Sequence, residues 1–159
     1  MMQIYILTGE VQTGKTTRLL QWCKQQSSIA GIASPIINDK RFFVDLETGE
    51  KKMMEAVEGE TGVETIGKYL FSKASFKWAE NILISAMNSG NNFIIIDEIG
   101  PLELLGKGFH HVLHQILASN IKNLLIVVRS PRIEEVLRMY EIKNAKIISE
   151  LEQVGWRRD

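Results

Sequence analysis

The chain has 159 residues, of which 45% are hydrophobic and 24% are charged, and this composition suits one globular domain with one core, residues 1–159. Lysine plus arginine equals aspartate plus glutamate at 19 each, so no general electrostatic attraction to nucleic acid or anionic lipid is expected. A single cysteine, Cys23, excludes an internal disulfide, and the absence of a signal peptide or of an apolar run near ~20 residues predicts a soluble, cytoplasmic protein without a membrane partner.

The first third of the chain predicts a strand, a loop and a helix. Residues 4–7 are a continuous apolar run, which is typical of a strand buried on both faces. A loop rich in glycine and threonine follows at 9–16, and the composition turns helical from Lys15 to about Gln26. Residues 29–57 favour antiparallel hairpins inserted into a larger α/β frame. The strand-like segments there are 32–37, 41–46 and 51–57.

Helices and fully apolar strands alternate in the rest of the chain. After a possible strand at 64–71, the predicted helices are 75–89, 109–117 and about 133–140. The predicted strands are 93–96, 124–128 and 145–148. This alternation predicts a three-layer α/β/α fold with a mainly parallel sheet.

The loop after the first strand fits the phosphate-binding pattern G-x-x-x-x-G-K-S/T. It consists of Gly9, Glu10, Val11, Gln12, Thr13, Gly14, Lys15 and Thr16. The glycines let main-chain N–H groups turn inward, and the following helix adds the positive end of its dipole. Lys15 is expected to contact the β- and γ-phosphates of a nucleoside triphosphate, and the Thr16 hydroxyl to bind Mg²⁺.

An acidic pair, Asp97-Glu98, ends the apolar strand 94–96 and resembles a Walker B motif. We expect Asp97 to bind Mg²⁺ and Glu98, which points to the other side of an extended segment, to orient an attacking water. Both motifs would lie at the carboxyl ends of parallel strands, where such folds bind ligands. About 80 residues separate Lys15 from Asp97. That leaves room for a further strand between the two motif strands, as in RecA-like ATPases.

These stretches resemble the small nucleoside-triphosphatase family described from thermophiles, whose relatives include the cancer-related NTPase. Residues 9–17, 94–104 and the hairpin region around 31–49 carry the likeness, and Asp97-Glu98-Ile99-Gly100 followed by Glu103-Leu104 is its most specific part. The resemblance implies a P-loop NTPase of RecA-like fold that hydrolyses several NTPs, with Mg²⁺, to NDP and phosphate. It adds Thr17 to the phosphate loop. Gln12-Thr13 stand where the family loop usually has Pro-Gly.

Three further side chains are candidates for the same site. Arg129 follows the strand 124–128 and is placed to stabilise the γ-phosphate, unless it forms a surface ion pair. Arg41 reaches the substrate only if the hairpin region folds over the site. Glu103 either binds or caps the next helix.

Two other functions use the same loop. A small-molecule kinase would employ Glu98 as the base for an acceptor hydroxyl, but the chain has only seven arginines and no cluster typical of an arginine-rich lid. A slow nucleotide-dependent switch would take a finger arginine from a partner. The motifs indicate neither the base preference nor the oligomeric state.

Overall fold

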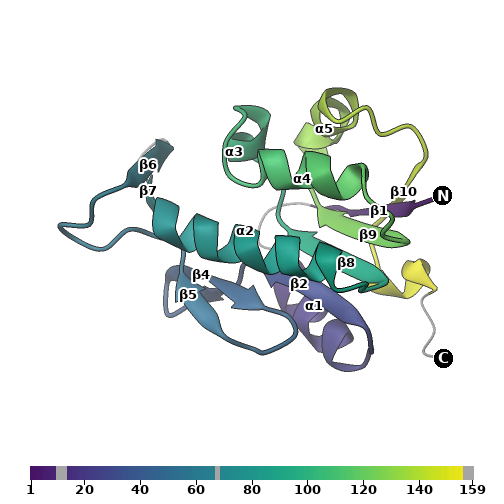
Figure 1. Ribbon diagram of the computed structural model, residues 1–159, viewed down its shortest axis with the longest axis horizontal. Coiled ribbons are helices and arrows are strands. Elements are labelled where there is room, and N and C mark those ends of the chain that lie inside the picture. The colour runs from purple at the N-terminus through teal and green to yellow at the C-terminus, as the bar shows by residue number, and fades with distance from the viewer. Residues whose placement is uncertain (10–13, 67–68, 156–159) are drawn as a thin grey trace.

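The computed structural model describes residues 1–9, 14–66 and 69–155, and strands and helices alternate in it from residue 69 onward (Figure 1). The strands are β1 Gln3–Leu7, β2 Ile29–Ala33, β3 Ile36–Ile37, β4 Lys40–Asp45, β5 Lys51–Met53, β6 Val63–Ile66, β7 Tyr69–Ser72, β8 Phe93–Asp97, β9 Asn123–Val127 and β10 Ala145–Ile148. The helices are α1 Lys15–Lys24, α2 Lys73–Asn88, α3 Pro101–Leu104, α4 His110–Leu117 and α5 Ile133–Met139, with short 3₁₀ segments η1 Ser130–Arg132 and η2 Leu151–Val154. None of the helices in these ranges is long and apolar enough to cross a membrane.

One sheet organises the molecule. Its strand order is β10-β1-β9-β8-β2-β4-β3, with β5 paired to β4. The five strands from β10 to β2 are parallel, whereas β4 runs antiparallel to β2, β3 and β5. A separate hairpin, β6–β7, leads into α2. The predicted mainly parallel sheet is therefore confirmed, and the carboxyl ends of its five parallel strands share one edge.

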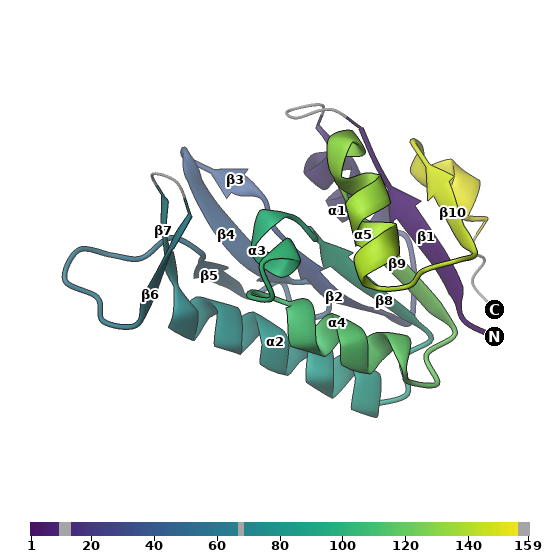
Figure 2. The same cartoon turned by 90° about the horizontal axis from the view of Figure 1, so that it is seen from above.

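Helices cover both faces of this sheet (Figure 2). Ile94 and Ile96 of β8 belong to the cluster that packs under α2, α4 and α5. Phe93 and Ile95 alternate with them and belong to the opposite cluster, with Leu19 of α1. Because side chains alternate along a strand, only a strand covered on both faces is apolar at every position. The fully apolar strands thus have the three-layer arrangement that the sequence predicts.

The antiparallel region is shorter than the predicted 29–57. Residues 29–33 form β2, which pairs in parallel with β8 and is buried throughout. Gly31 has φ 135°, and a Cβ there would overlap the main chain of Ile95. The small side chains of β2 therefore serve close packing inside the central sheet, and only β3, β4 and β5 extend it with antiparallel strands.

The strand between the two motif strands also comes from an unexpected part of the chain. β9 lies between β1 and β8, although it follows β8 in sequence. The segment between the motifs instead supplies β2 on the far side of β8. One strand does lie between the two motif strands, as in RecA-like sheets. That strand is β9, which follows the acidic pair in sequence.

Candidate active site

The first turn of α1 presents the predicted phosphate-binding groups. Gly14 adopts a left-handed conformation, with φ 75° and ψ 18°, and Lys15 and Thr16 begin the helix directly after it. Burial lowers the pKa of Lys15, and the positive charges of Arg18 and Arg129 lower it further. Thr17 is exposed on the same turn. The predictions for Glu10, Val11, Gln12 and Thr13 concern residues outside the described ranges, and Gly9 precedes that gap.

Asp97 lies next to Thr16, although the two are 81 residues apart in sequence. The Thr16 hydroxyl donates a hydrogen bond of 2.9 Å to Oδ2 of Asp97. The carboxylate is only 3% exposed. Burial raises the pKa of Asp97, whereas its hydrogen bonds with Thr16 and Ser34 lower it. A hydroxyl and a carboxylate side by side are the hard oxygen ligands that Mg²⁺ prefers, so these residues fit the expected metal.

Ser34, which the sequence analysis did not single out, also holds Asp97. Its main-chain N–H donates to Oδ2 of Asp97 at 3.2 Å, and its hydroxyl donates to the main-chain oxygen of Asp97. Ser34 is 2% exposed and follows the last residue of β2. The signal that could identify Ser34 is its place directly after β2. A polar residue at the carboxyl end of a central parallel strand is a candidate for the binding site.

Glu98 has a different set of neighbours from Asp97. Its Oε2 lies 3.4 Å from Nε of Arg129, which follows β9. Burial raises the pKa of Glu98, and the Arg129 guanidinium counteracts this effect. The direct contacts of the two carboxylates differ, because Asp97 accepts from Thr16 and Ser34 whereas Glu98 pairs with Arg129. Arg129 therefore forms an ion pair, which was one of the two alternatives for this residue. Its partner is Glu98 of the acidic pair.

The antiparallel extension also brings a cation to this edge of the sheet. Arg41 of β4 donates from Nη1 to the main-chain oxygen of Ser34 at 3.1 Å. Its charge opposes the effect of burial on the pKa values of Asp97 and Glu98. Arg41 comes near the acidic pair because β4 extends the sheet beside β2, and its contact with a substrate stays a prediction.

Glu103 supports the segment that follows the acidic pair. It is 4% exposed, and its two carboxylate oxygens accept from the main-chain N–H groups of Gly100 at 2.8 Å and Phe109 at 2.9 Å. Tyr140 donates from its hydroxyl to the main-chain oxygen of Glu103 at 3.3 Å. Burial raises the pKa of Glu103 to about 7. Of the two alternatives left open for this residue, the structure supports capping, because Glu103 accepts from Phe109, the N-cap residue of the next helix α4, and from Gly100, the N-cap residue of α3.

Comparisons with known proteins match nearly the whole chain. A family model described as NTPase matches residues 4–153. The nucleoside-triphosphatase THEP1 of Sulfolobus acidocaldarius is 29% identical over 160 residues, covering 93% of this chain and 90% of the relative. THEP1 of Korarchaeum cryptofilum is 28% identical, with 92% of this chain and 76% of the relative covered.

Two solved structures share the fold. THEP1 from the hyperthermophile Aquifex aeolicus superposes with a TM-score of 0.72 at 23% identity, over 92% of this chain and 88% of that one. A human cancer-related nucleoside triphosphatase gives a TM-score of 0.69 at 20% identity, over 96% and 90% of the two chains. The arrangement of strands and helices is therefore that of both proteins.

Proposed function

Because the chain belongs to the NTPase family, we propose that it is a magnesium-dependent enzyme that hydrolyses ATP, GTP and other nucleoside triphosphates to the diphosphate and phosphate. Hydrolysis of nucleoside triphosphates follows from the family. The metal, the substrate range and the residue roles are our proposals. The observation that carries them is the hydrogen bond between Thr16 and Asp97, which joins the end of the phosphate loop to the acidic pair.

Lys15 and the start of α1 are proposed to bind the triphosphate. The ammonium of Lys15 supplies one positive charge, and the first main-chain N–H groups of a helix, which lack acceptors within the helix itself, are suited to phosphate oxygens. The nearby Arg18 and Arg129 make this region more positive. An anion bound here therefore relieves repulsion among cations as well as forming hydrogen bonds.

Thr16 and Asp97 are proposed to hold Mg²⁺ through their oxygens. The chemistry that the metal supplies when bound is neutralisation of charge on the β- and γ-phosphate oxygens. The contribution of the chain is to keep the Asp97 carboxylate in one orientation. The N–H of Ser34 and the hydroxyl of Thr16 do this by both donating to Oδ2 of Asp97.

Glu98 is proposed to orient the attacking water. The oxygen of that water forms a bond to the γ-phosphorus, the bond from the γ-phosphorus to the bridging oxygen breaks, and the electron pair leaves on the β-phosphate of the NDP. A carboxylate that accepts a hydrogen bond from the water aligns this attack and can take its proton. Arg129, whose Nε lies 3.4 Å from Oε2 of Glu98, is proposed to stabilise the charge that develops on the γ-phosphoryl group.

Phosphate release with and without Mg²⁺ tests this function. We expect steady release of phosphate from ATP, GTP, CTP and UTP with Mg²⁺ and none with excess EDTA. Release that requires an added acceptor hydroxyl would instead indicate a kinase, and tight binding without release would indicate a switch. Either result would refute the proposed hydrolase.

Two variants test the assigned residues. Lys15→Ala should lose the thermal stabilisation by Mg²⁺ and NTP that the wild type shows; ligand at 100 times its Kd stabilises a protein by roughly 2.7 kcal/mol. Glu98→Gln should keep that stabilisation and lose turnover. The matched controls are Lys24→Ala and Glu134→Gln, which change exposed residues on α1 and α5. Unchanged stabilisation in Lys15→Ala, or wild-type turnover in Glu98→Gln, would contradict the corresponding role.

We also propose a cytoplasmic location with a small-molecule substrate and no nucleic-acid partner. The equal numbers of acidic and basic residues support this, because the chain has no net charge to attract a polyanion. The single cysteine is consistent with a reducing compartment.

A further inference from the structure

A cavity of about 250 Å³ lies between α2 and the segment that joins α3 to α4. One wall is a face of α2 that carries Lys73, Phe76 and Lys77, and the other includes Leu102 of α3 and residues 107–108. We call it the α2–α3 cavity. It belongs to the side of the sheet where α2 and α4 lie side by side (Figure 1, Figure 2). Among the described residues that line it, none belongs to the candidate active site.

The floor of this cavity is apolar and reachable from solvent. Phe76 and Leu102 are each only partly buried. Phe76 packs against the buried ring of Phe109, with ring centroids 5.4 Å apart, so its own ring is held in place. An apolar cavity of ~150 Å³ is enough to hold benzene, so the α2–α3 cavity accommodates an aromatic ring or a large aliphatic side chain.

The second wall is fixed by the buried carboxylate of Glu103. Gly108 has φ 57°, and a Cβ at this position would overlap Oε2 of Glu103. The two oxygens of Glu103 accept from the main-chain N–H groups of Gly100 and Phe109. The wall is therefore tied to the start of α3 and to the start of α4, and the cavity is formed before any ligand arrives.

The rim of the cavity is positively charged. Three lysines, at positions 73, 77 and 107, line it together with one acid, Glu80. Glu80 already lies 3.3 Å from the ammonium of Lys77. The chain as a whole has no net charge, so this excess of cations is a local property of the cavity. It favours an anionic ligand, with the charges contributing more to specificity and rate of association than to affinity.

The distribution of these cations favours a ligand with several acidic groups. Lys73 and Lys77 are exposed and lie ~6 Å apart along the axis of α2, whereas Lys107 is exposed on the opposite wall. Apolar surface also extends past the cavity. Leu105, at i+3 from Leu102, is 64% exposed. A polypeptide segment can cover this surface and carry carboxylates on both sides of an apolar residue, which a small organic acid cannot do.

We propose that the α2–α3 cavity is a docking site for an acidic segment of a partner protein. One aromatic or large aliphatic side chain of the partner fills the cavity over Phe76 and Leu102, and flanking carboxylates face the lysines of the rim. An apolar anchor surrounded by polar contacts is the usual composition of a protein interface. The proposal does not depend on the proposed hydrolysis, because none of its residues takes part in that reaction.

A synthetic peptide provides the probe. It is acetylated and amidated, and one phenylalanine lies between two runs of aspartate. Calorimetry at low ionic strength should show that it binds, and that changing its phenylalanine to alanine or its aspartates to asparagine weakens binding roughly tenfold or more. Absence of binding, or equal binding of all three peptides, would overturn the proposal.

A charge reversal in the rim locates the binding. Lys73→Glu should weaken binding of the peptide roughly tenfold while phosphate release stays at the wild-type rate. The variant should fold, because Lys73 begins α2 and an acidic residue in the first turn of a helix is favourable. The matched control is Lys143→Glu, an exposed residue between α5 and β10, which should bind the peptide like the wild type. Undiminished binding in Lys73→Glu, or the same loss in both variants, would refute the assigned position.

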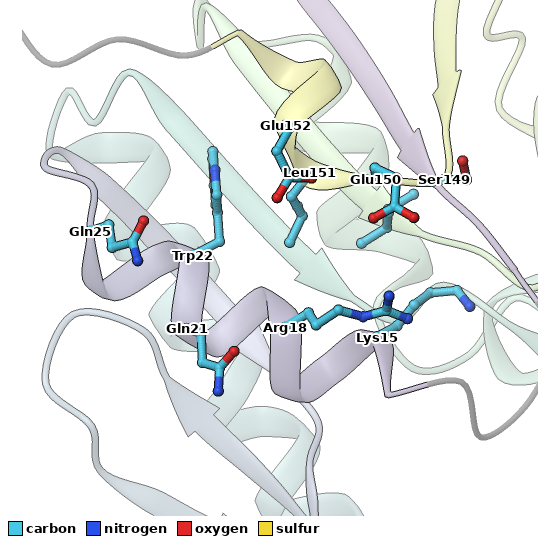
Figure 3. A pocket seen from close by; sticks show the side chains of 10 residues that line it. Lys15, Arg18, Gln21, Trp22, Gln25, Ser149, Glu150, Leu151 and Glu152 are labelled. Carbon is cyan, nitrogen blue, oxygen red and sulfur yellow. The ribbon is translucent and has the colours of Figure 1, made fainter.

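Competition distinguishes this site from the other cationic region of interest. Lys15 and Arg18 project from α1, which packs on the opposite face of the sheet and could also attract aspartates (Figure 3). Peptide binding should persist in Lys15→Ala and in the presence of a saturating non-hydrolysable ATP analogue with Mg²⁺. Displacement by the analogue would instead place the peptide at the candidate active site. Phenylacetate that binds as tightly as the peptide would assign the cavity to a small organic acid. Each of these two results contradicts a protein partner at this cavity.

Discussion

Replacement of Glu103 by glutamine should change how the stability of the protein depends on pH. Burial raises the pKa of Glu103 to about 7 in the folded chain, against a usual value of 4.5. Between these values the folded chain retains a proton that the unfolded chain has released, so the free energy of unfolding falls as pH rises. This stabilisation is fully present below pH ~4.5 and is lost by pH ~7, and it amounts to roughly 3 kcal/mol.

Glutamine removes this titration and adds a cost that does not depend on pH. Its amide oxygen can accept one of the two N–H groups that Glu103 holds, from Gly100 or Phe109, but its NH₂ group then faces the other. A buried donor left without an acceptor costs roughly 1–3 kcal/mol. The variant should therefore be less stable than wild type at pH 5, and the difference should shrink or reverse by pH 8.

Urea unfolding at pH 5, 6, 7 and 8 measures this difference directly. Subtracting the variant from the wild type cancels most contributions of the other titrating groups. The difference should change by roughly 3 kcal/mol between pH 5 and pH 8. Glu134→Gln, which changes an exposed carboxyl on α5, should follow the wild-type profile. A difference between wild type and Glu103→Gln that stays constant with pH would refute the reasoning.

Three further substitutions test the surroundings of the acidic pair. Ser34→Ala removes the hydroxyl that donates to the main chain of Asp97, so we expect the free energy of unfolding in urea to fall by roughly 1–3 kcal/mol and the Mg²⁺ concentration for half-maximal activity to rise. An unchanged metal requirement would show that Ser34 has only a structural role. Gly31→Ala should prevent stable folding, visible as loss of cooperative unfolding, because β8 leaves no space for a methyl group; a normally folded variant would contradict the close approach of β2 and β8. Arg129→Ala should lower kcat far more than it raises KM, since its proposed role is in the transition state, and a change confined to KM would instead indicate ground-state binding.

Sequence periodicity predicts those parts of this fold that are buried on both faces. β1, β8 and β9 are continuous apolar runs, and their pairing in parallel follows from the helices between them. Lys15 and Thr16 were found from a pattern whose spacing is itself set by phosphate geometry. Asp97 and Glu98 were found because acidic residues at the end of a buried strand have a specific chemical use. The contact between Thr16 and Asp97 agrees with both interpretations.

Local sequence patterns do not predict which strand a short segment pairs with. Residues 29–33 contain two alanines and a glycine, so only Ile29 and Ile32 are residue types that mark a strand. Their partner β8 lies some 60 residues later. The place of Ser34 followed from that pairing and was missed with it. Arg41 likewise reaches the site only because β4 pairs with β2. The positions of Ser34 and Arg41 depend on contacts between strands that are distant in sequence, so they cannot be predicted from the local sequence of one segment.

The separation of the proposed catalytic groups along the chain has a consequence for biosynthesis. Lys15 is made before Glu98 and Arg129, which follow it by about 80 and about 110 residues. A nascent chain that ends before β9 would lack the central strand that lies between β1 and β8, so it should not assemble a site able to turn over a triphosphate. We therefore expect turnover of a triphosphate only from chains in which β9 has been made.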